Sequence, residues 1–198
     1  MGLVSGKSLA SLAEGGGSSG LTSTQVQTLI KSNTPYQHVA TLTADSSSEF
    51  DYTSLPSTFR TFYIKFDGLG FSSQTYLRMR LYFDSTLYTG NLYFHGGMNK
   101  DTTSTSNFHG QGGEWDFTKN YPAGSNSNMT GYIEFTGNDN ATRATMNSFL
   151  TWYNSSSVRS TLSGGHVNAN ETAYITGFKL FPTSGTMTRG RIKIYGVN

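Results

Sequence analysis

The sequence ends in AYITGFKLF (Ala173–Phe181) and TRGRIKIYGV (Thr188–Val197), which flank the turn PTSGTM (Pro182–Met187). In the second run, Ile192 and Ile194 alternate with charged and aromatic side chains. An alternation of period two is typical of a strand with one buried face and one solvent-facing face. The end of the chain therefore predicts two strands joined by a loop, and favours antiparallel β-structure.

The composition of the whole chain points the same way. With 26 Ser, 27 Thr, 14 Asn and 23 Gly, four small residue types make up nearly half of the 198 residues, and charged residues are only 13%. Strands and turns use such residues, whereas long helices need runs of Lys, Glu and Ala. Aromatic residues reach 14%, so a core can still be buried. The length fits one sandwich or barrel with a short appendage, and not two large domains.

From Pro35 onward the sequence predicts a succession of short strands. They are Tyr36–Ala44, Ser48–Thr53, Arg60–Phe66, Tyr76–Phe83, Asn91–Phe94, Thr130–Thr136, Ala144–Tyr153, Val158–Val167 and the two terminal strands. Two of them alternate clearly, with Phe62, Ile64 and Phe66, and then Leu77, Met79, Leu81 and Phe83, as the inward residues. Strands without intervening helices give an antiparallel, jelly-roll-like β-sandwich rather than a parallel sheet. We assign it to residues 34–198.

Residues 1–33 differ in character. Gly15–Gly20 has the composition of a flexible linker. After it, Thr22 and Gln25 form a capping box that predicts the start of a short helix. The apolar face of this helix consists of Val26, Leu29 and Ile30. A helix of about ten residues is not stable alone in water, so we expect it to pack either on its own β-domain or on other copies, as an anchor and oligomerisation segment.

The C-terminal sequence resembles that of small all-β modules in phage and prophage tail fibres and other virion proteins. These modules end in a pattern like I-x-G-F-x-L-F-x-x-S-G-x-I-x-x-G-x-I-x-L-Y-G. The matching residues are Ile175, Gly177, Phe178, Leu180, Phe181, Ser184, Gly185, Met187, Gly190, Ile192, Ile194, Tyr195 and Gly196. This resemblance implies the fold and a virion context.

The resemblance continues through about 160 residues. It includes the segments His38–Leu55, Phe59–Leu69 and Leu77–Leu81 (LRMRL), which match the family's strand openings and its strand rich in Leu and Arg. The family often carries a D-G-G-S-T turn after that strand, whereas this chain has DSTLYTG at Asp84–Gly90. The pattern carries no catalytic signature, so it implies fold and context better than an activity.

Two carboxylates flank an aromatic residue at Glu114, Trp115 and Asp116. A glycosidase needs a pair of carboxylates on either side of one sugar. The same two acids would also be found in an exposed turn, where charged residues serve only solubility. Catalysis is therefore the less favoured interpretation.

The segment Gly96–Asn128 is the longest run without periodicity, and we expect it to be a long loop. It contains Phe108, Trp115, Phe117 and Tyr121 among small polar residues. Long loops with embedded aromatics are common binding sites, and aromatic faces stack on sugar rings. We therefore expect ligand-binding residues here, namely Trp115, Tyr121, Glu114, Asp116 and His109. The alternative is that the rings anchor the loop on the sandwich. Trp152, in the middle of a strand, is expected in the core.

Basic side chains form two stripes. Arg78 and Arg80 alternate with Leu77 and Met79, and the last strand carries Arg189, Arg191 and Lys193 in the same manner. Cross-strand stacking on tyrosines and protection against edge-to-edge aggregation explain such stripes structurally. The functional alternative is a basic face that docks acidic lipopolysaccharide or an acidic neighbour in the virion.

Several classes of protein are disfavoured by the sequence. Cysteine is absent, and the four histidines, at positions 38, 95, 109 and 166, are scattered singly, so neither a metal site nor a cofactor is expected. A net charge of +2 gives no concentrated basic surface for nucleic acid. No stretch approaches the length of a membrane span or a signal sequence, so no membrane insertion is expected.

These observations lead to the hypothesis of a non-enzymatic phage virion protein, assembled in the host cytoplasm. Residues 1–33 would attach it to other virion proteins and to two sister copies in a homotrimer, and the sandwich would present a fibre or knob surface to a host polysaccharide. The second hypothesis is a capsid or tail decoration protein with purely structural contacts. The third is a glycan-degrading enzyme.

Overall fold

In the computed structural model, residues 22–25, 34–125, 127–137, 143–154, 157–168 and 174–197 are described. The chain divides between Pro35 and Tyr36 into two units. In the second unit the strands are β1 (Tyr36–Thr43), β2 (Phe50–Tyr52), β3 (Thr61–Phe71), β4 (Leu77–Phe83), β5 (Thr86–Leu87), β6 (Tyr93–Lys100), β7 (Thr105–Gly112), β8 (Trp115–Asp116), β9 (Met129–Thr136), β10 (Thr145–Asn154), β11 (Ser157–Val167), β12 (Ile175–Pro182) and β13 (Met187–Val197).

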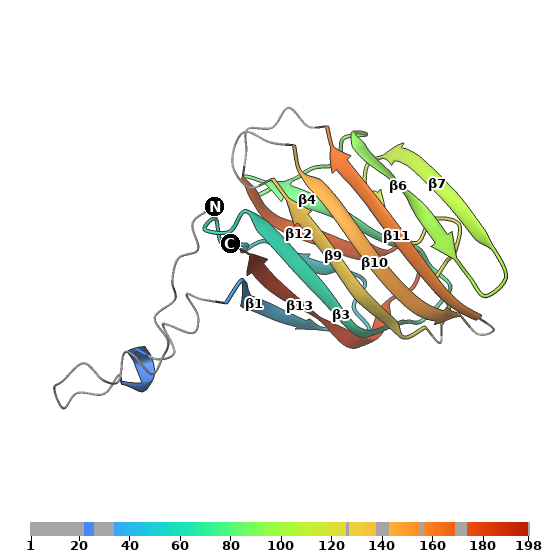
Figure 1. The fold of residues 1–198 in the computed structure, drawn as a ribbon, viewed down its shortest axis with the longest axis horizontal. Coiled ribbons are helices and arrows are strands. Elements are labelled where there is room, and N and C mark those ends of the chain that lie inside the picture. Colours follow the sequence, from blue (N-terminus) through green and yellow to red (C-terminus); the bar gives the residue numbers. More distant parts are fainter. Residues whose placement is uncertain are drawn as a thin grey trace, which may run out of the picture. The chain divides into compact units, whose positions relative to one another are not determined.

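The strands form two antiparallel sheets, which confirms the expected all-β sandwich. The large sheet has eight strands in the order β1-β13-β3-β9-β10-β11-β6-β7, and the small sheet has the order β2-β12-β4-β5, with β8 added on β4. In Figure 1 the large sheet lies in front of β4 and β12, with β1 and β7 at its opposite edges. The chain crosses repeatedly between the sheets, as from β3 to β4 and from β11 to β12.

The core lies between the two sheets and comes from the alternation read in the sequence. The inward residues predicted for the strands at 60–66 and 76–83 are all buried, as are Ile192, Ile194 and Trp152. Phe178 and Leu180 of β12 close the core from the small sheet. Burial of this apolar surface contributes roughly 25 cal/mol for each Å² removed from water. The inward residues that the alternation identifies therefore also provide the main stabilisation of the fold.

In the first unit, the capping box predicted at Thr22 and Gln25 is confirmed. The Thr22 backbone N–H donates to the Gln25 side-chain oxygen at 2.8 Å, and the Gln25 backbone N–H donates to the Thr22 hydroxyl at 3.2 Å. A helical turn follows at residues 23–25. The proposed anchor residues Val26, Leu29 and Ile30, and the linker Gly15–Gly20, lie outside the described residues.

The expectation of a long loop over Gly96–Asn128 is wrong. β6 continues to Lys100, β7 pairs with it over eight residues, and β8 pairs with β4. These strands could not be predicted from the sequence, because Gly96 and Gly97 have no side chains and so give no alternation of apolar and polar residues. β7 contains a single apolar residue, Phe108, so its period is equally hidden.

β3 is longer than its periodic pattern predicted, reaching Phe71 rather than Phe66. The register of β3 against β13 shifts in this part. Gly68 and Gly190 have φ values of 72° and 87°, and a Cβ on Gly190 would come within 2.3 Å of the Gly68 carbonyl oxygen. Such a bulge breaks the strict alternation, which is why the pattern ended early.

Candidate functional site

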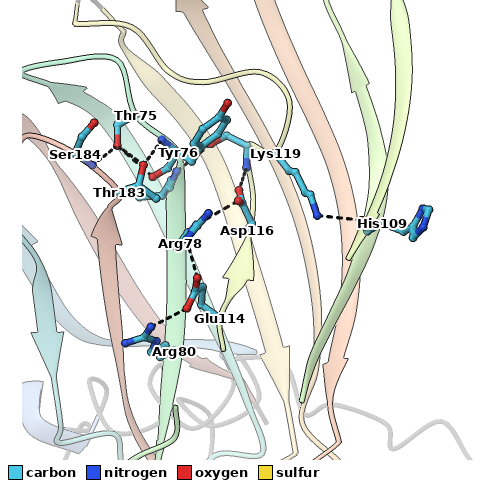
Figure 2. Close-up of polar contacts among 12 residues, drawn as sticks. Thr75, Tyr76, Arg78, Arg80, His109, Glu114, Asp116, Lys119, Thr183 and Ser184 are labelled. Carbon is cyan, nitrogen blue, oxygen red and sulfur yellow. Dashed lines mark hydrogen bonds and ion pairs between the residues drawn. The ribbon is translucent and has the colours of Figure 1, made fainter. Parts of the chain in front are cut away.

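The carboxylates Glu114 and Asp116 bind the two arginines of β4 (Figure 2). Arg78 contacts the Glu114 carboxylate at 2.7 Å and the Asp116 carboxylate at 3.2 Å, and Arg80 contacts the second Glu114 oxygen at 2.7 Å. β8 places these acids there because it pairs with β4 across Arg78 and Met79. Both oxygens of Glu114 therefore accept hydrogen bonds from guanidinium groups.

Asp116 is the more deeply buried of the two acids. Burial raises the pKa of Asp116, and the charge of Arg78 opposes that rise. Its second oxygen accepts the Thr118 backbone N–H at 3.3 Å. The expectation that this segment is an exposed turn is wrong, and the arrangement is a partly buried ion-pair network that fastens β8 to the small sheet.

Trp115 is fully buried, with 0% of its surface exposed. Its ring packs edge-on against that of Tyr93, with the centroids 5.4 Å apart. Phe117 is buried to the same extent, and Phe108 is 6% exposed. The prediction that Trp115 contacts a ligand is therefore wrong, and the alternative, in which these rings anchor the segment on the sandwich, is confirmed.

Tyr121 and His109 lie apart from the carboxylates. Tyr121 is half-buried, its hydroxyl lies 3.0 Å from that of Ser104, and the Arg159 guanidinium lies over its ring at 4.9 Å. His109 is exposed on the edge strand β7, and its backbone carbonyl accepts a hydrogen bond from Lys119 at 3.1 Å (Figure 2). The five ligand-binding residues proposed from the sequence thus do not form one site.

The two basic stripes lie on different sheets, because β4 belongs to the small sheet and β13 to the large one. On β4, the arginines are paired with carboxylates, and Arg80 also lies over the Phe181 ring at 5.3 Å. On β13, Arg189 donates to the Ser127 carbonyl, and Arg191 and Lys193 contact Asp67 at 2.8 and 3.8 Å. They do not form one continuous basic face.

We call the side of the large sheet that faces away from the small sheet the outer face. The strand registers align its residues in rows across the sheet. One row contains His38, Tyr195, Tyr63, Glu134, Asn147, Gly164, Gly96 and His109, in the order from β1 to β7. The two adjacent glycines, Gly164 and Gly96, leave this row without side chains near the β7 edge.

A surface pocket of about 450 Å³ lies at Gly96, and we call it the glycine pocket. It is lined by Phe94, His95, Gly96, His109, Gly110, Gln111, Gly165 and His166. The Phe94 and His166 rings, from neighbouring strands, stack with centroids 5.0 Å apart and an interplanar angle of 13°. The Gln111 amide donates to the Asn91 carbonyl at 2.7 Å, which fixes its orientation. The pocket thus combines an aromatic surface with imidazole and amide groups.

A second pocket, of about 340 Å³, lies on the same face near the β1 edge. We call it the tyrosine pocket, and it is lined by Tyr36, Tyr63, Lys65 and Tyr195. Tyr63 packs against Tyr36 with ring centroids 5.5 Å apart and stacks on Tyr132 at 5.1 Å. Burial, followed by the neighbouring Tyr132, raises the pKa of Tyr63.

An apolar row connects the two pockets. Tyr132, Phe149, Leu162 and Met98 stand opposite one another on β9, β10, β11 and β6. Phe149, Leu162 and Met98 are 43%, 55% and 44% exposed, so this row is solvent-facing. Large apolar side chains gathered on one exposed face commonly mark a binding surface.

Sequence reasoning missed this face because its residues come from eight strands, whose order in the sheet differs from their order in the chain. The only local signals were the Gly-Gly pairs at Gly96–Gly97 and Gly164–Gly165, each of which interrupts a strand. Glycine inside a strand often marks close approach of a ligand or of another backbone.

Within the described residues, no group of three or more His, Asp or Glu side chains is arranged to hold a metal ion, and no helix has the length and apolarity of a membrane span.

Comparison of the chain with protein-family models, with curated proteins and with solved structures found no match.

Proposed function

We propose that this protein is a non-enzymatic virion component that binds a host surface glycan through the outer face of the large sheet. The observation that carries the proposal is the glycine pocket, where the Phe94 and His166 ring stack borders Gly96. We propose the outer face instead of the loop site expected from the sequence, because Trp115 is buried and both carboxylate oxygens of Glu114 are paired with arginines.

Glycan recognition needs a flat apolar surface for the sugar ring beside groups that bond its hydroxyls. The glycine pocket offers both, since aromatic rings present large contact area with little entropy to lose. A Cβ on Gly164 would lie 3.3 Å from the Asn147 side-chain oxygen, so this amide lies beside the glycines. His109 and Gln111 supply further hydrogen-bonding groups from β7. A neutral or weakly charged ring is the ligand type that fits.

The exposed apolar row supports the second candidate, a decoration protein with structural contacts. Phe149 and Leu162 would then be covered by another virion protein, as in the hydrophobic centre of an interface. The two candidates differ in whether an isolated polysaccharide binds the purified protein.

The glycine pocket can be filled without disturbing the fold. A Cβ on Gly96 would meet its nearest atom, the Phe108 carbonyl oxygen, at 3.4 Å, which is ordinary contact. We expect Gly96→Val to lose at least tenfold in affinity for glycans selected from an array of bacterial capsular and lipopolysaccharide glycans, because the side chain occupies the space of the ring. Isothermal titration calorimetry measures the affinity.

The matched control is Thr151→Val, which places the same side chain on the outer face of β10, away from the pocket. Its affinity should stay within twofold of the unmodified protein. If Gly96→Val folds normally and binds undiminished, the glycine pocket is not the site. If no glycan of the array binds, the structural candidate replaces the proposal.

The proposed assembly is a homotrimer attached to other virion proteins through residues 1–33. Three copies would multiply a weak single-site affinity by valency. We expect the full chain to sediment as a trimer in analytical ultracentrifugation and residues 34–198 to sediment as a monomer. A full chain that stays monomeric at high concentration would rule out self-association.

A further inference from the structure

Two lysines stand directly opposite each other on the outer face. Lys65 of β3 pairs in register with Lys193 of β13. Like charges in this position destabilise a sheet, so the opposed pair costs stability rather than adding to it. Lys193 reaches Asp67 at 3.8 Å, whereas Lys65 has no ion-pair partner among the described residues.

The surrounding charges leave an excess of positive charge. Arg191 binds Asp67 at 2.8 Å, and this hydrogen bond lowers the pKa of Asp67. Asp67 therefore faces three cations, because Arg191 and Lys193 contact it and the charge of Lys65 also lowers its pKa. Glu134 lies opposite Tyr63 on β9 but forms no ion pair with Lys65. The net charge of the outer face around Lys65 and Lys193 is therefore positive.

Lys65 also lines the tyrosine pocket, where three phenol groups lie beside it. The Tyr63 hydroxyl, whose pKa burial raises, is protonated at neutral pH as any phenol is and can donate a hydrogen bond. An ammonium group together with hydroxyl donors is a suitable environment for a carboxylate, sulfate or phosphate group, since hydrogen bonds to charged acceptors are the stronger ones. The rings of Tyr36 and Tyr195 provide apolar surface for the sugar that carries the anion.

We propose that the ligand is an acidic polysaccharide that runs across the strands, with a sugar ring in the glycine pocket and an anionic group at Lys65 and Lys193. This inference rests on the proposed function. β3 and β6 are separated by four strand spacings, or roughly 19 Å, so the ligand must be an oligomer. Tyr132, Phe149 and Leu162 form an apolar floor between the two pockets. The length requirement separates this ligand from a monosaccharide or a free anion.

The test uses the full chain and the glycan of the bacterial array that binds most tightly. Affinity is measured by calorimetry for that glycan and for its carboxyl-reduced, desulfated or dephosphorylated form, at low and at moderate salt. The variant Lys65→Gln/Lys193→Gln is compared with Lys100→Gln, which removes a lysine from β6 on the same face. Fragments of increasing length test whether both pockets are filled.

We expect the selected glycans to be acidic, and the double variant to bind them at least tenfold more weakly. The neutralised glycan should bind the protein and the double variant equally, and Lys100→Gln should change affinity less than twofold. Affinity should rise steeply once a fragment spans both pockets. Because it removes the opposed charges, the double variant should also keep or raise the thermal midpoint, which would show that its loss of binding is not a loss of folding.

Selection of neutral glycans, equal affinity of the unmodified protein for the acidic and neutralised forms, or undiminished binding of the acidic glycan by the double variant would overturn the inference. In that case loss of binding by Gly96→Val would still uphold the proposed function. Absence of binding to every glycan of the array would overturn both. An acidic peptide is measured by the same calorimetry, and binding of this peptide without binding of any glycan would also overturn both and would indicate a protein partner for this face.

Discussion

Replacement of Trp115 by alanine is expected to lower the free energy of unfolding by about 3–5 kcal/mol, which is the usual cost of removing a large aromatic side chain from a core. Trp115 is 0% exposed and packs edge-on against Tyr93 between the sheets. The Tyr93 hydroxyl in turn accepts the Leu81 backbone N–H at 2.9 Å and donates to the Tyr88 carbonyl. The cavity would therefore loosen a hydrogen-bonded part of the small sheet.

Urea denaturation at neutral pH measures this change. Trp115→Phe is the control, and we expect it to cost less than half as much, because it keeps most of the apolar volume. It also removes an indole N–H that has no hydrogen-bonding partner among the described residues. At a temperature where Trp115→Ala remains folded, its affinity for the selected glycan should be unchanged. A cost below 1 kcal/mol, or a selective loss of binding, would contradict the structural role.

Acidification from pH 7 to pH 4 is expected to destabilise the protein through His95. Burial, together with the charges of Lys119 and Arg78 and against an opposing effect of Glu114, lowers the pKa of this histidine from 6.5 to about 4. The unfolded chain takes up a proton near pH 6.5, whereas the folded protein does so only near pH 4. The stability is therefore fully present above pH 6.5 and is lost as the pH falls to about 4.

The expected loss over this range is about 3 kcal/mol, because one pKa unit corresponds to about 1.4 kcal/mol. Comparison of the free energy of unfolding at pH 7 and pH 4 with that of His95→Phe isolates the contribution. The subtraction is needed because Asp116, whose pKa is raised by burial, acts in the opposite direction. His38→Gln, at an exposed histidine, serves as the control. Equal pH dependence with and without His95 would disprove the role of its burial.

The interior beside His95 explains why the outer face there can be open. Ser148 and Ser163 face inward from β10 and β11 and approach each other at 2.6 Å, and Asn99 donates to the Lys119 carbonyl from β6. All three polar residues are buried, and the segment that follows Trp115 holds Asn99 through the Lys119 carbonyl. The β6–β7 end of the large sheet is therefore supported from within, and its glycines remain free to form a pocket outside.

The prediction of strands succeeded where side chains alternate. The inward sets at 60–66 and 76–83, the two terminal strands and the core position of Trp152 could all be predicted, because one buried face requires apolar residues at every second position. It failed at β7, where only Phe108 is apolar, and at the end of β3, where a bulge interrupts the period. Trp115 was assigned to a loop because its strand, β8, has only two residues.

The site residues also divide into features that the sequence predicts and features that depend on the tertiary structure. Glu114 and Asp116 were singled out as a pair, but their ion pairs with Arg78 and Arg80 depend on β8 lying beside β4, and Arg78 and Glu114 are 36 residues apart in the chain. The resemblance to virion proteins remains a prediction, as do the trimer and the anchor.

The sequence by itself determined the fold class, because a period of two is a local property that each strand displays independently of its neighbours. It also determined the start of the N-terminal helical turn, since Thr22 and Gln25 bond across only three residues. Only the tertiary structure decided which surface is available for binding. The glycine pocket, the tyrosine pocket and the opposed lysines arise from the order and register of strands, which depend on contacts between residues far apart in the chain.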